Sequence, residues 1–289
     1  TLSLSKSPAL KTLATTIFIC LFCKTIIAQS SDPIIISKAL FVPAEKTIFH
    51  KIGDRNIAVK IFQYGDVKDF VCINVHANET SSFKAAKSVL EEKGGTIIKI
   101  ENTNQRVIKF RLNGITYGFD PNRIYSRIGI EQTLRDNRRT SKQAILEIEK
   151  FAGRLLQLIP DSTKCIIALH NNTEEAYSVR SYLPDGNRKK DAKAVYKDST
   201  QDVDDIAFTT DSLLYQRMAD FGFNSIWQDN EKVKKDGSLS VYCGENDKRY
   251  INIETQHGKV EQYIIMLEKL LQLLFEENHN NLDKPDEEL

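Results

Sequence analysis

The sequence has almost no net charge and shows no internal repeat. Among its 289 residues, 40 are basic and 39 acidic, so no whole-molecule field attracts nucleic acid or a membrane surface. Hydrophobic residues make up 41% of the chain, which is typical of a globular protein with one large α/β domain or two small ones. No shift in composition marks a boundary between domains. Function must therefore come from a local site.

Long apolar runs are scarce, and the one that stands out lies near the start of the chain. Lys6 and Lys11 precede an apolar stretch from Leu13 to Cys23, and Ala28 follows as a small residue at a cleavage position. This layout is typical of a secretory signal peptide over residues 1–28, and the stretch is short for a membrane span. A retained N-terminal anchor is the alternative. We expect an exported protein, periplasmic or secreted, with no membrane contact beyond this segment.

Cysteine is also sparse, with five residues in the whole chain. Cys20 and Cys23 lie in the apolar N-terminal stretch, where they are interpreted as membrane-compatible residues and not as a redox pair. The remaining three, Cys72, Cys165 and Cys243, are odd in number, and two of them lie in apolar strand patterns. An exported protein permits one disulfide, but we expect buried free thiols.

The remaining pattern alternates between strands and helices. Strands are expected at 34–37, 47–52, 57–63, 69–75, 96–101, 164–170, 224–228, 238–243 and 249–255, and helices at 81–93, 141–158, 210–221 and 259–276. Residues 106–119 predict a hairpin that turns at Asn113-Gly114. This order predicts a three-layer α/β fold with a mixed, mostly parallel central sheet, formed by a single domain over 29–277 and followed by a polar tail over 278–289. The polar segment 184–205 is expected to be an exposed, lid-like loop.

Histidine is the scarce residue that points to a site. There are five, and His76 and His170 each come directly after a buried-strand pattern, in "FVCINVH" and "KCIIALH". Ligands bind at the carboxyl ends of strands in open α/β sheets, so these two imidazoles converge if their strands are parallel neighbours. Glu79 follows His76 by one turn. Two imidazole nitrogens and one carboxylate form a three-ligand zinc set with a position left for water. The alternative is that each histidine simply ends its strand in a loop.

Two further stretches carry charged residues in unusual places. In "YGFDPNRIYS", Asp120, Asn122 and Arg123 follow an aromatic strand, an arrangement that suits a bidentate hold on a carboxylate; the alternative is a capped turn with a solvated arginine. In "YINIETQHGK", Glu254 lies within a strand pattern. Burial of a carboxylate there is costly unless it is paired or has a function, and general-base catalysis is one such function. An edge strand with Glu254 facing solvent is the alternative, and the role of His257 stays open.

The four stretches "HANE", "DPNR", "ALH" and "NIE" resemble, in this order, the motifs of zinc carboxypeptidases and of their succinylglutamate desuccinylase and aspartoacylase relatives. The resemblance covers residues 76 to 254. It implies a three-layer α/β fold and one zinc ion. The implied roles are metal ligation by His76, Glu79 and His170; support of His76 by Asp120; substrate carboxylate binding by Asn122 and Arg123; and general base, then proton donor, for Glu254.

The sequence departs from this family in three places. The family's mobile tyrosine is expected before the catalytic glutamate, and Tyr242 is a candidate whose spacing does not settle the assignment. An arginine that polarises the scissile carbonyl is expected before "DPNR"; Arg106 and Arg111 both qualify, and Arg106 is preferred. The motif "DPNRIY" is as close to the desuccinylase form as to the carboxypeptidase form. Cleavage of a peptide and cleavage of an acyl-amino acid therefore both stay open.

These observations favour a secreted zinc-dependent hydrolase, a metallopeptidase or a related amidohydrolase, that cleaves an amide bond in a peptide or acyl-amino acid with a free carboxylate. Two other classes of protein compete with this prediction. One is a non-catalytic secreted protein that binds a peptide or glycan through the 184–205 segment. The other is a structural surface protein with no pocket where the strands end.

Overall fold

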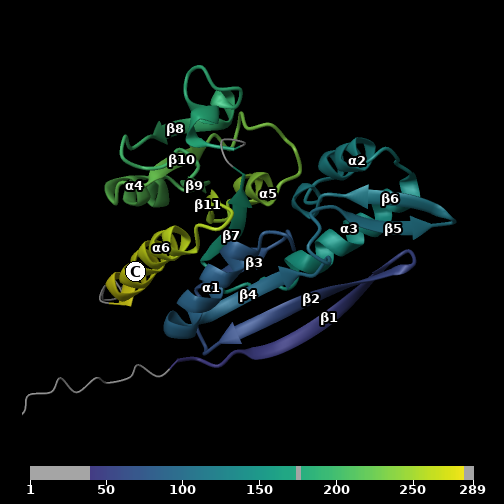
Figure 1. Ribbon diagram of the computed structural model, residues 1–289, viewed down its shortest axis with the longest axis horizontal. Helices are drawn as coiled ribbons and strands as arrows, with labels where there is room; N and C mark the ends of the chain where they lie inside the picture. The colour runs from purple at the N-terminus through teal and green to yellow at the C-terminus, as the bar shows by residue number, and fades with distance from the viewer. Residues whose placement is uncertain (1–39, 174–176, 283–289) are drawn as a thin grey trace, which may run out of the picture. The chain divides into compact units, whose positions relative to one another are not determined.

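The computed structural model describes residues 40–173 and 177–282, and among these residues nine strands form one mixed sheet (Figure 1). The strands are β1 Ala44–Ile52, β2 Arg55–Tyr64, β3 Phe70–Asn74, β4 Gly95–Ile100, β7 Cys165–Asn172, β8 Ala192–Tyr196, β9 Ile206–Thr209, β10 Asn224–Gln228 and β11 Tyr250–Gln256. They lie side by side in the order β1-β2-β4-β3-β7-β11-β9-β10-β8. The central strands β4, β3, β7 and β11 are parallel, and antiparallel pairs lie toward both edges. The predicted fold class is confirmed.

The apolar runs of the sequence form the centre of this sheet. Every residue of β3 and of β7 is buried, because helices cover both faces of these strands. The two strands are parallel neighbours, with Val71 opposite Ile166 and Ile73 opposite Ala168. Their carboxyl ends therefore meet at one edge, which is the condition that the convergence of His76 and His170 requires.

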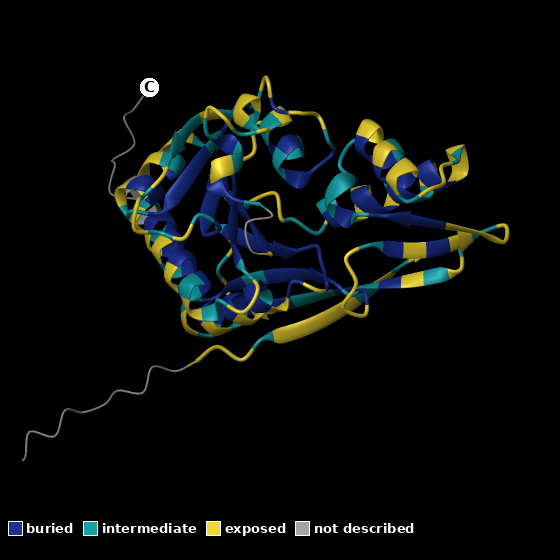
Figure 2. Ribbon diagram, turned by 45° about the horizontal axis from the view of Figure 1, so that its top comes forward, coloured by how far each residue is buried: buried dark blue, intermediate teal, exposed yellow. Residues whose placement is uncertain are grey.

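Helices pack on both faces of the sheet. The larger helices are α1 Thr80–Lys93, α2 Arg127–Asp136, α3 Lys142–Leu156, α4 Ser212–Asp220, α5 Leu239–Glu245 and α6 Val260–Leu282. Apolar residues of α1, α4 and α6 form one core with the sheet, and those of α2, α3 and α5 form the other. Figure 2 shows the buried strands between these partly exposed helices. The sandwich has three layers.

A separate hairpin supplies the loop beside the site. Strands β5 Ile108–Leu112 and β6 Ile115–Phe119 pair antiparallel and turn at the predicted Asn113-Gly114. Both turn residues have positive φ angles, 50° and 78°, which a two-residue hairpin loop of this type requires. The chain leaves β6 at Asp120 and enters the short 3-10 helix η1, Pro121–Arg123. The hairpin thus places the "DPNR" stretch beside the sheet.

Two sequence predictions need correction. Residues 238–243 were expected to form a strand, but Leu239–Glu245 is helix α5. Ser238 is the N-cap of this helix, and its side chain accepts a hydrogen bond from the Val241 N–H. The 184–205 segment is not only a loop, since it contains the 3-10 helix η3, Lys189–Asp191, and the edge strand β8. A further 3-10 helix, η2, spans Val179–Tyr182 just before this segment.

Several predictions fall in parts of the chain that stay outside this description. The signal segment over 1–28 and the strand expected at 34–37 lie outside the described residues. Residues 40–173 and 177–282 all belong to one compact unit. Helix α6 continues to Leu282, into the part that the composition assigns to the polar tail. Within 40–173 and 177–282, no helix has the length and apolar character needed to cross a membrane.

Candidate metal centre and catalytic cavity

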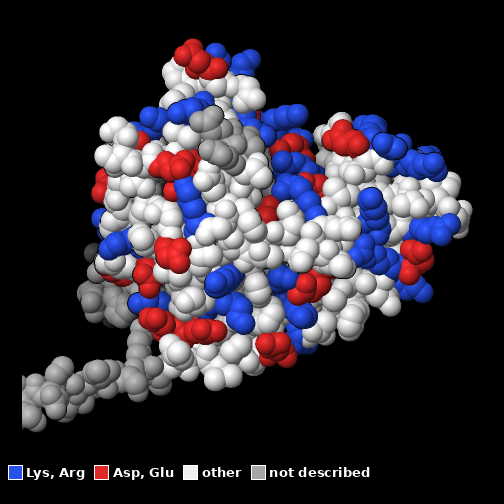
Figure 3. All heavy atoms as spheres, in the orientation of Figure 1, with Lys and Arg blue, Asp and Glu red and all other residues white. Residues whose placement is uncertain are grey.

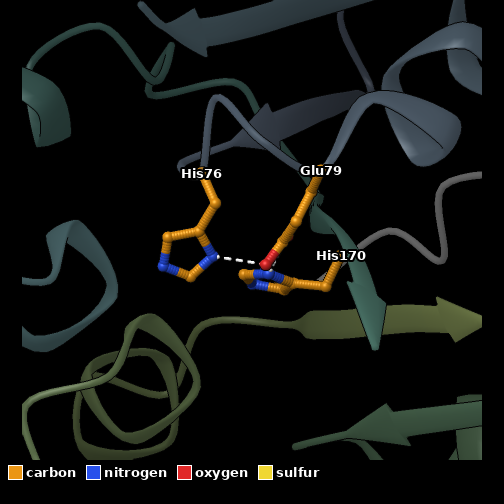
Figure 4. Close-up of side chains that lie close together, drawn as sticks. All are labelled: His76, Glu79 and His170. Atoms are coloured by element: carbon orange, nitrogen blue, oxygen red, sulfur yellow. Dashed lines mark hydrogen bonds and ion pairs between the residues drawn. The ribbon is translucent and has the colours of Figure 1, made fainter. Parts of the chain in front are cut away.

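His76, Glu79 and His170 converge on one point at the carboxyl ends of β3 and β7 (Figure 4). Their candidate ligand atoms all lie within 4.8 Å of one another. His76 Nδ1 is 2.7 Å from Glu79 Oε1, and His170 Nδ1 is 2.7 Å from Glu79 Oε2. The three side chains are 0%, 3% and 5% exposed, so the point where they meet is shielded from bulk water.

Hydrogen bonds to the backbone hold the turn that carries His76 and Glu79. The Glu79 N–H donates to the His76 carbonyl at 3.1 Å, and the Asn74 side-chain amide donates to the carbonyls of Glu79 and Leu169. Because Leu169 lies in β7, the Asn74 amide ties the turn after β3 to the strand that carries His170. Separation of the two histidines would break this buried network.

The donor atoms fit a divalent metal ion. His76 Nδ1 is buried and, although it lies close to Glu79, has no hydrogen-bond partner of suitable geometry among the described residues. A buried nitrogen in this condition is costly unless something binds it. Two imidazole nitrogens and one carboxylate oxygen form a common three-residue zinc set, which leaves a fourth position for water or substrate. His76, Glu79 and His170 are therefore consistent with a single metal site.

The electrostatics of the three residues also suit a cation. Burial alone would lower the pKa of His76, but the carboxylates of Glu79 and Asp120 outweigh burial and raise this pKa above its usual value. Burial opposes ionisation of Glu79, yet the two histidines hold the pKa of this carboxyl well below its usual range. The lowered pKa favours the ionised carboxylate of Glu79, and its negative charge favours a cation between the histidines.

Asp120 supports His76 from the side opposite Glu79. His76 Nε2 donates to Asp120 Oδ1 at 2.7 Å, which fixes the ring and directs Nδ1 toward Glu79. Asp120 also accepts from the Asn122 backbone N–H at 2.8 Å. Burial alone would raise the pKa of Asp120, but the hydrogen bond to His76 and the charges of Arg106 and Arg123 hold this pKa well below its usual range. Asp120 thus contacts His76, and its support of a metal ligand stays a prediction.

Arg106 joins the same cluster, and Arg111 does not. Arg106 Nη1 donates to Glu79 Oε1 and its Nε donates to Asp120 Oδ2, both at 2.9 Å. Arg111 lies in β5, where its backbone N–H donates to Asp54 Oδ1 and its guanidinium to the Gly114 carbonyl. Of the two arginines that the sequence offered, only Arg106 reaches the candidate metal centre.

Glu254 lies next to this centre on β11. It is opposite His170 in the parallel register with β7, and it is 8% exposed. Asn252 donates its side-chain amide to Glu254 Oε2 at 3.0 Å. Burial raises the pKa of Glu254, and the Glu79 charge adds to this, while His170 and Asn252 oppose it. A carboxyl in this setting holds a proton more readily than one in water, as a general base requires. The alternative of an edge strand with Glu254 facing solvent is excluded.

One cavity of about 450 Å³ connects most of the predicted residues. Of these residues, the lining includes Glu79, Arg106, Asn122, Arg123, His170 and Glu254. Arg123 is held by its own bond to the Asn122 carbonyl and lies 3.6 Å from Asp236 Oδ2. Asn122 Oδ1 accepts from the Leu239 N–H, and its NH₂ group lies 3.5 Å from His170 Nε2, which leaves one of its two N–H donors for a ligand. A structural protein with no pocket at the strand ends is thereby excluded.

Tyr242 lies elsewhere in the structure. It belongs to helix α5, its ring is 6.2 Å from the Tyr125 ring, and it is absent from the residues that line the cavity. The strand predicted for 238–243 would have directed alternate side chains toward the cavity. The helix instead presents Ser238, Ser240 and Val241 to the cavity. The structure therefore does not bring Tyr242 to the other candidate residues.

The cavity also contains residues that the sequence reasoning missed. Tyr177, Tyr182 and Arg188 line it from the segment after β7, and Asn252 and Tyr250 line it from β11. Asn252 had a sequence signal, because it occupies the same face of the strand as Glu254 two residues later. No comparable signal marks Arg188, which lies in a polar, charged stretch typical of a solvated loop.

The face of the molecule in Figure 3 carries both signs of charge. In the view of Figure 3, basic and acidic side chains are mixed over the visible face. This mixture agrees with the near-zero net charge of the chain.

No protein-family model and no curated protein sequence matches the chain. Solved structures with a similar chain path include an aspartoacylase family protein from Mesorhizobium loti, 13% identical, covering 81% of this chain and 67% of that one, with a TM-score of 0.42. Thrombin activatable fibrinolysis inhibitor is 10% identical over 82% of this chain and 70% of its own, with a TM-score of 0.48. Murein-tripeptide amidase MpaA from Escherichia coli O157 is 10% identical over 87% and 96%, with a TM-score of 0.41.

At such identities and TM-scores the likeness concerns the path of the chain, and the candidate site rests on its own geometry. A buried His-Glu-His group at the strand ends of a mixed α/β sheet suggests a metallohydrolase.

Proposed function

We propose that this protein is a zinc-dependent hydrolase that cleaves an amide bond in a peptide or acyl-amino acid with a free carboxylate. One observation carries the proposal: the candidate metal ligands Glu79 and His170, the buried Glu254 and the basic side chains of Arg106 and Arg123 all line a single cavity. A metal ligand set, a base and an anion-binding group are the parts that metal-assisted amide hydrolysis needs.

His76, Glu79 and His170 would hold the zinc ion. When bound there, zinc would supply a Lewis acid for a carbonyl oxygen and lower the pKa of a water molecule to about 7. Glu254 would accept the proton of the attacking water and then pass it to the leaving amine nitrogen. Its environment supports both steps, because burial makes the protonated form accessible while Asn252 orients the carboxyl.

The arginines would position the substrate. Arg106 would stabilise negative charge that develops on the carbonyl oxygen, because its guanidinium lies against Glu79 at the centre of the site. Arg123 and the Asn122 amide would bind the free carboxylate and so determine which bond lies beside Glu254. This division of roles explains why two arginines belong to the same cavity.

A matched pair of substrates tests this function. The purified protein with one equivalent of zinc is incubated with peptides and acyl-amino acids that end in a free carboxylate, and with the same compounds as C-terminal amides. We expect hydrolysis of the free acids and a loss of roughly 10- to 100-fold in kcat/KM for the amides, since each loses a charged hydrogen bond to Arg123. In Arg123→Gln this difference should disappear. Equal hydrolysis of acids and amides by the unmodified protein would contradict the carboxylate requirement.

Export of the protein is a further part of the proposal, supported by the lysines and the apolar stretch that precede Ala28. The substrate would then lie outside the cytoplasm, in the periplasm or medium. Expression of the chain with residues 1–28 in a bacterial host, followed by N-terminal sequencing of the exported protein, should give Gln29 as the first residue. Recovery of the uncleaved chain in the membrane fraction would instead support a retained anchor.

A further inference from the structure

The near-zero net charge of the chain hides an uneven distribution of charge. Residues 105–142, which span the β5–β6 hairpin, η1, α2 and the first residue of α3, contain nine basic and three acidic side chains, a net charge of +6. The rest of the chain contains 31 basic and 36 acidic side chains, a net charge of −5. Within the mixed charges of Figure 3, basic side chains gather over β5, β6 and α2. A local excess of one sign attracts an oppositely charged partner even when the whole molecule is nearly neutral.

Four of these nine basic side chains are already engaged. They are Arg106 and Arg123, which line the catalytic cavity, and Arg127 and Arg135, which form ion pairs with Glu131. The other five are exposed, and none has a carboxylate within ion-pair distance among the described residues. We call these five the basic surface: Lys109, Arg111, Arg138, Arg139 and Lys142.

The basic surface is continuous because the segment that joins α2 to α3 lies along the hairpin. The Asn137 side chain packs against Gly118 of β6, where an added Cβ would lie 3.2 Å from the Asn137 Cβ. At the hairpin turn, the Asn113 side-chain amide donates to Gln143 Oε1 of α3 at 3.5 Å. The three basic residues between Asn137 and Gln143 therefore lie next to the hairpin that carries the other two.

Two carboxylates outside these ion pairs neutralise part of the basic surface. Asp54 Oδ1 accepts a hydrogen bond from the Arg111 backbone N–H at 2.8 Å. These two residues line a surface recess of about 490 Å³ together with Arg55 and Lys109. Asp136 ends α2, next to the second group of cations. Two negative charges stand against the five cations of the basic surface and Arg55, so positive charge remains in excess.

The hairpin turn adds an exposed apolar side chain to this surface. Ile115 pairs with Leu112 across the turn, one position from Arg111, and is 39% exposed. An anionic bilayer offers a contact for both kinds of side chain, because its phosphate groups attract the cations and its acyl boundary receives the isoleucine. A soluble anionic polymer offers only the first of these contacts.

We infer that the basic surface, with Ile115 at its edge, binds the surface of an anionic lipid bilayer. The sequence placed membrane contact in the N-terminal stretch alone, and the basic surface adds a second contact within the described residues. Guanidinium groups form paired hydrogen bonds with phosphate, and each cation near an anionic bilayer strengthens binding by about five-fold. None of the five basic residues lines the catalytic cavity, so the inference does not depend on the proposed hydrolysis.

Vesicle binding of the full chain tests this inference. Dissociation constants are measured by co-sedimentation at low salt, with phosphatidylcholine vesicles and with vesicles that contain about one third phosphatidylglycerol. Arg111→Gln/Arg139→Gln removes one cation from the hairpin and one from the segment before α3. Lys84→Gln/Arg217→Gln removes two exposed cations from α1 and α4, in the other helical layer, and is the matched control. Residues 1–28 are kept in every protein, so their contribution is common to all.

We expect the unmodified chain and the control variant to bind the anionic vesicles equally well and more tightly than the phosphatidylcholine vesicles. Arg111→Gln/Arg139→Gln should bind the anionic vesicles roughly 10- to 30-fold more weakly. Ile115→Ser should weaken this binding several-fold but leave binding to heparin, a soluble anionic polymer, unchanged.

Equal affinity of Arg111→Gln/Arg139→Gln and of the control for anionic vesicles overturns the inference. It is also overturned if the arginine variant loses heparin and vesicle binding alike while Ile115→Ser loses neither, because the basic surface would then recognise an anionic polymer and not a bilayer.

Discussion

Glu254 of β11 lies directly opposite His170 of β7 in a parallel pair of central strands. This register places a buried carboxyl beside a candidate metal ligand although the two residues are far apart in the sequence. His170 lowers the pKa of Glu254, while burial and the Glu79 charge raise it more strongly. The relationship places the candidate base beside one candidate metal ligand on adjacent strands of one sheet, an arrangement suited to a water molecule shared between them.

Replacement of Glu254 by glutamine should abolish catalysis and spare binding. Glutamine keeps the shape but cannot accept the proton of water, so we expect kcat to fall by about 10²- to 10⁴-fold with little change in KM or zinc content. Glu261→Gln, on the exposed first turn of α6, is the matched control. A secreted binding protein without catalytic activity would bind ligand and show no turnover, either with Glu254 or with glutamine in its place. Turnover that is unchanged in Glu254→Gln would show that Glu254 has no part in the mechanism.

Loss of one imidazole should empty the candidate metal centre. We expect about one zinc per chain in the purified protein and a large loss of bound zinc in His76→Ala, because two ligands rarely hold zinc against buffer. Elemental analysis after dialysis measures this directly. His257→Ala is the control, since His257 is exposed and outside the candidate ligand set. Equal zinc contents in all three proteins would show that His76 is not a ligand.

Asp120 should act on the metal through His76. Its carboxylate accepts the His76 Nε2–H at 2.7 Å, so Asp120→Asn weakens the hold on the ring without removing a ligand. We expect zinc affinity to fall by roughly 10- to 100-fold, measured by competition with a chromophoric chelator. Asp161→Asn, in the exposed turn after α3, is the control and should leave affinity unchanged. An unaltered affinity in Asp120→Asn would mean that the ring is held by packing alone.

The candidate metal residues could be predicted because local patterns encode them. A fully apolar strand that ends on a histidine marks the edge of a buried sheet, and the same pattern occurs before His76 and before His170. The pattern does not show that the two strands are neighbours, because strand order depends on long-range packing. The resemblance of four motifs in order supplied that information, and the parallel β3–β7 pair agrees with it.

The parts that could not be predicted depend on tertiary context. The stretch 238–243 carries short alternating apolar residues typical of a strand, but the Ser238 cap and burial of Leu239 and Cys243 stabilise a helix instead. Tyr242 was a candidate only because the resemblance expects a tyrosine before the catalytic glutamate, and in the structure it lies on this helix, outside the cavity lining. Arg188 was missed for a related reason. A polar segment is typical of a solvent-exposed loop, and only the fold shows that Arg188 lines the cavity.

Asp205 and Asp202 should give opposite pH dependences of stability, although both lie near the same lysine. Lys259 Nζ is 2.6 Å from Asp202 Oδ2 and 3.5 Å from Asp205 Oδ1. Asp205 is buried, and burial raises its pKa from 3.8 to about 6 despite the lysine. Asp202 is exposed, and its hydrogen bond to Lys259 lowers its pKa. The charge of Lys259 therefore does not offset the burial of the Asp205 carboxylate, but it stabilises the ionised form of Asp202.

The raised pKa of Asp205 means that the folded state binds this proton more tightly than the unfolded state does. The bound proton of Asp205 contributes fully to the free energy of unfolding below pH 3.8, and this contribution is lost as the pH rises through about 6. Asp205→Asn should therefore raise the free energy of unfolding at pH 7.5 by about 1–3 kcal/mol and have little effect at pH 4. Asp202→Asn should lower it at pH 7.5, because a depressed pKa stabilises the fold at higher pH. Thermal unfolding of both variants at the two pH values decides the matter: a destabilised Asp205→Asn at pH 7.5 would show that the Lys259 ion pair outweighs the burial of this carboxylate.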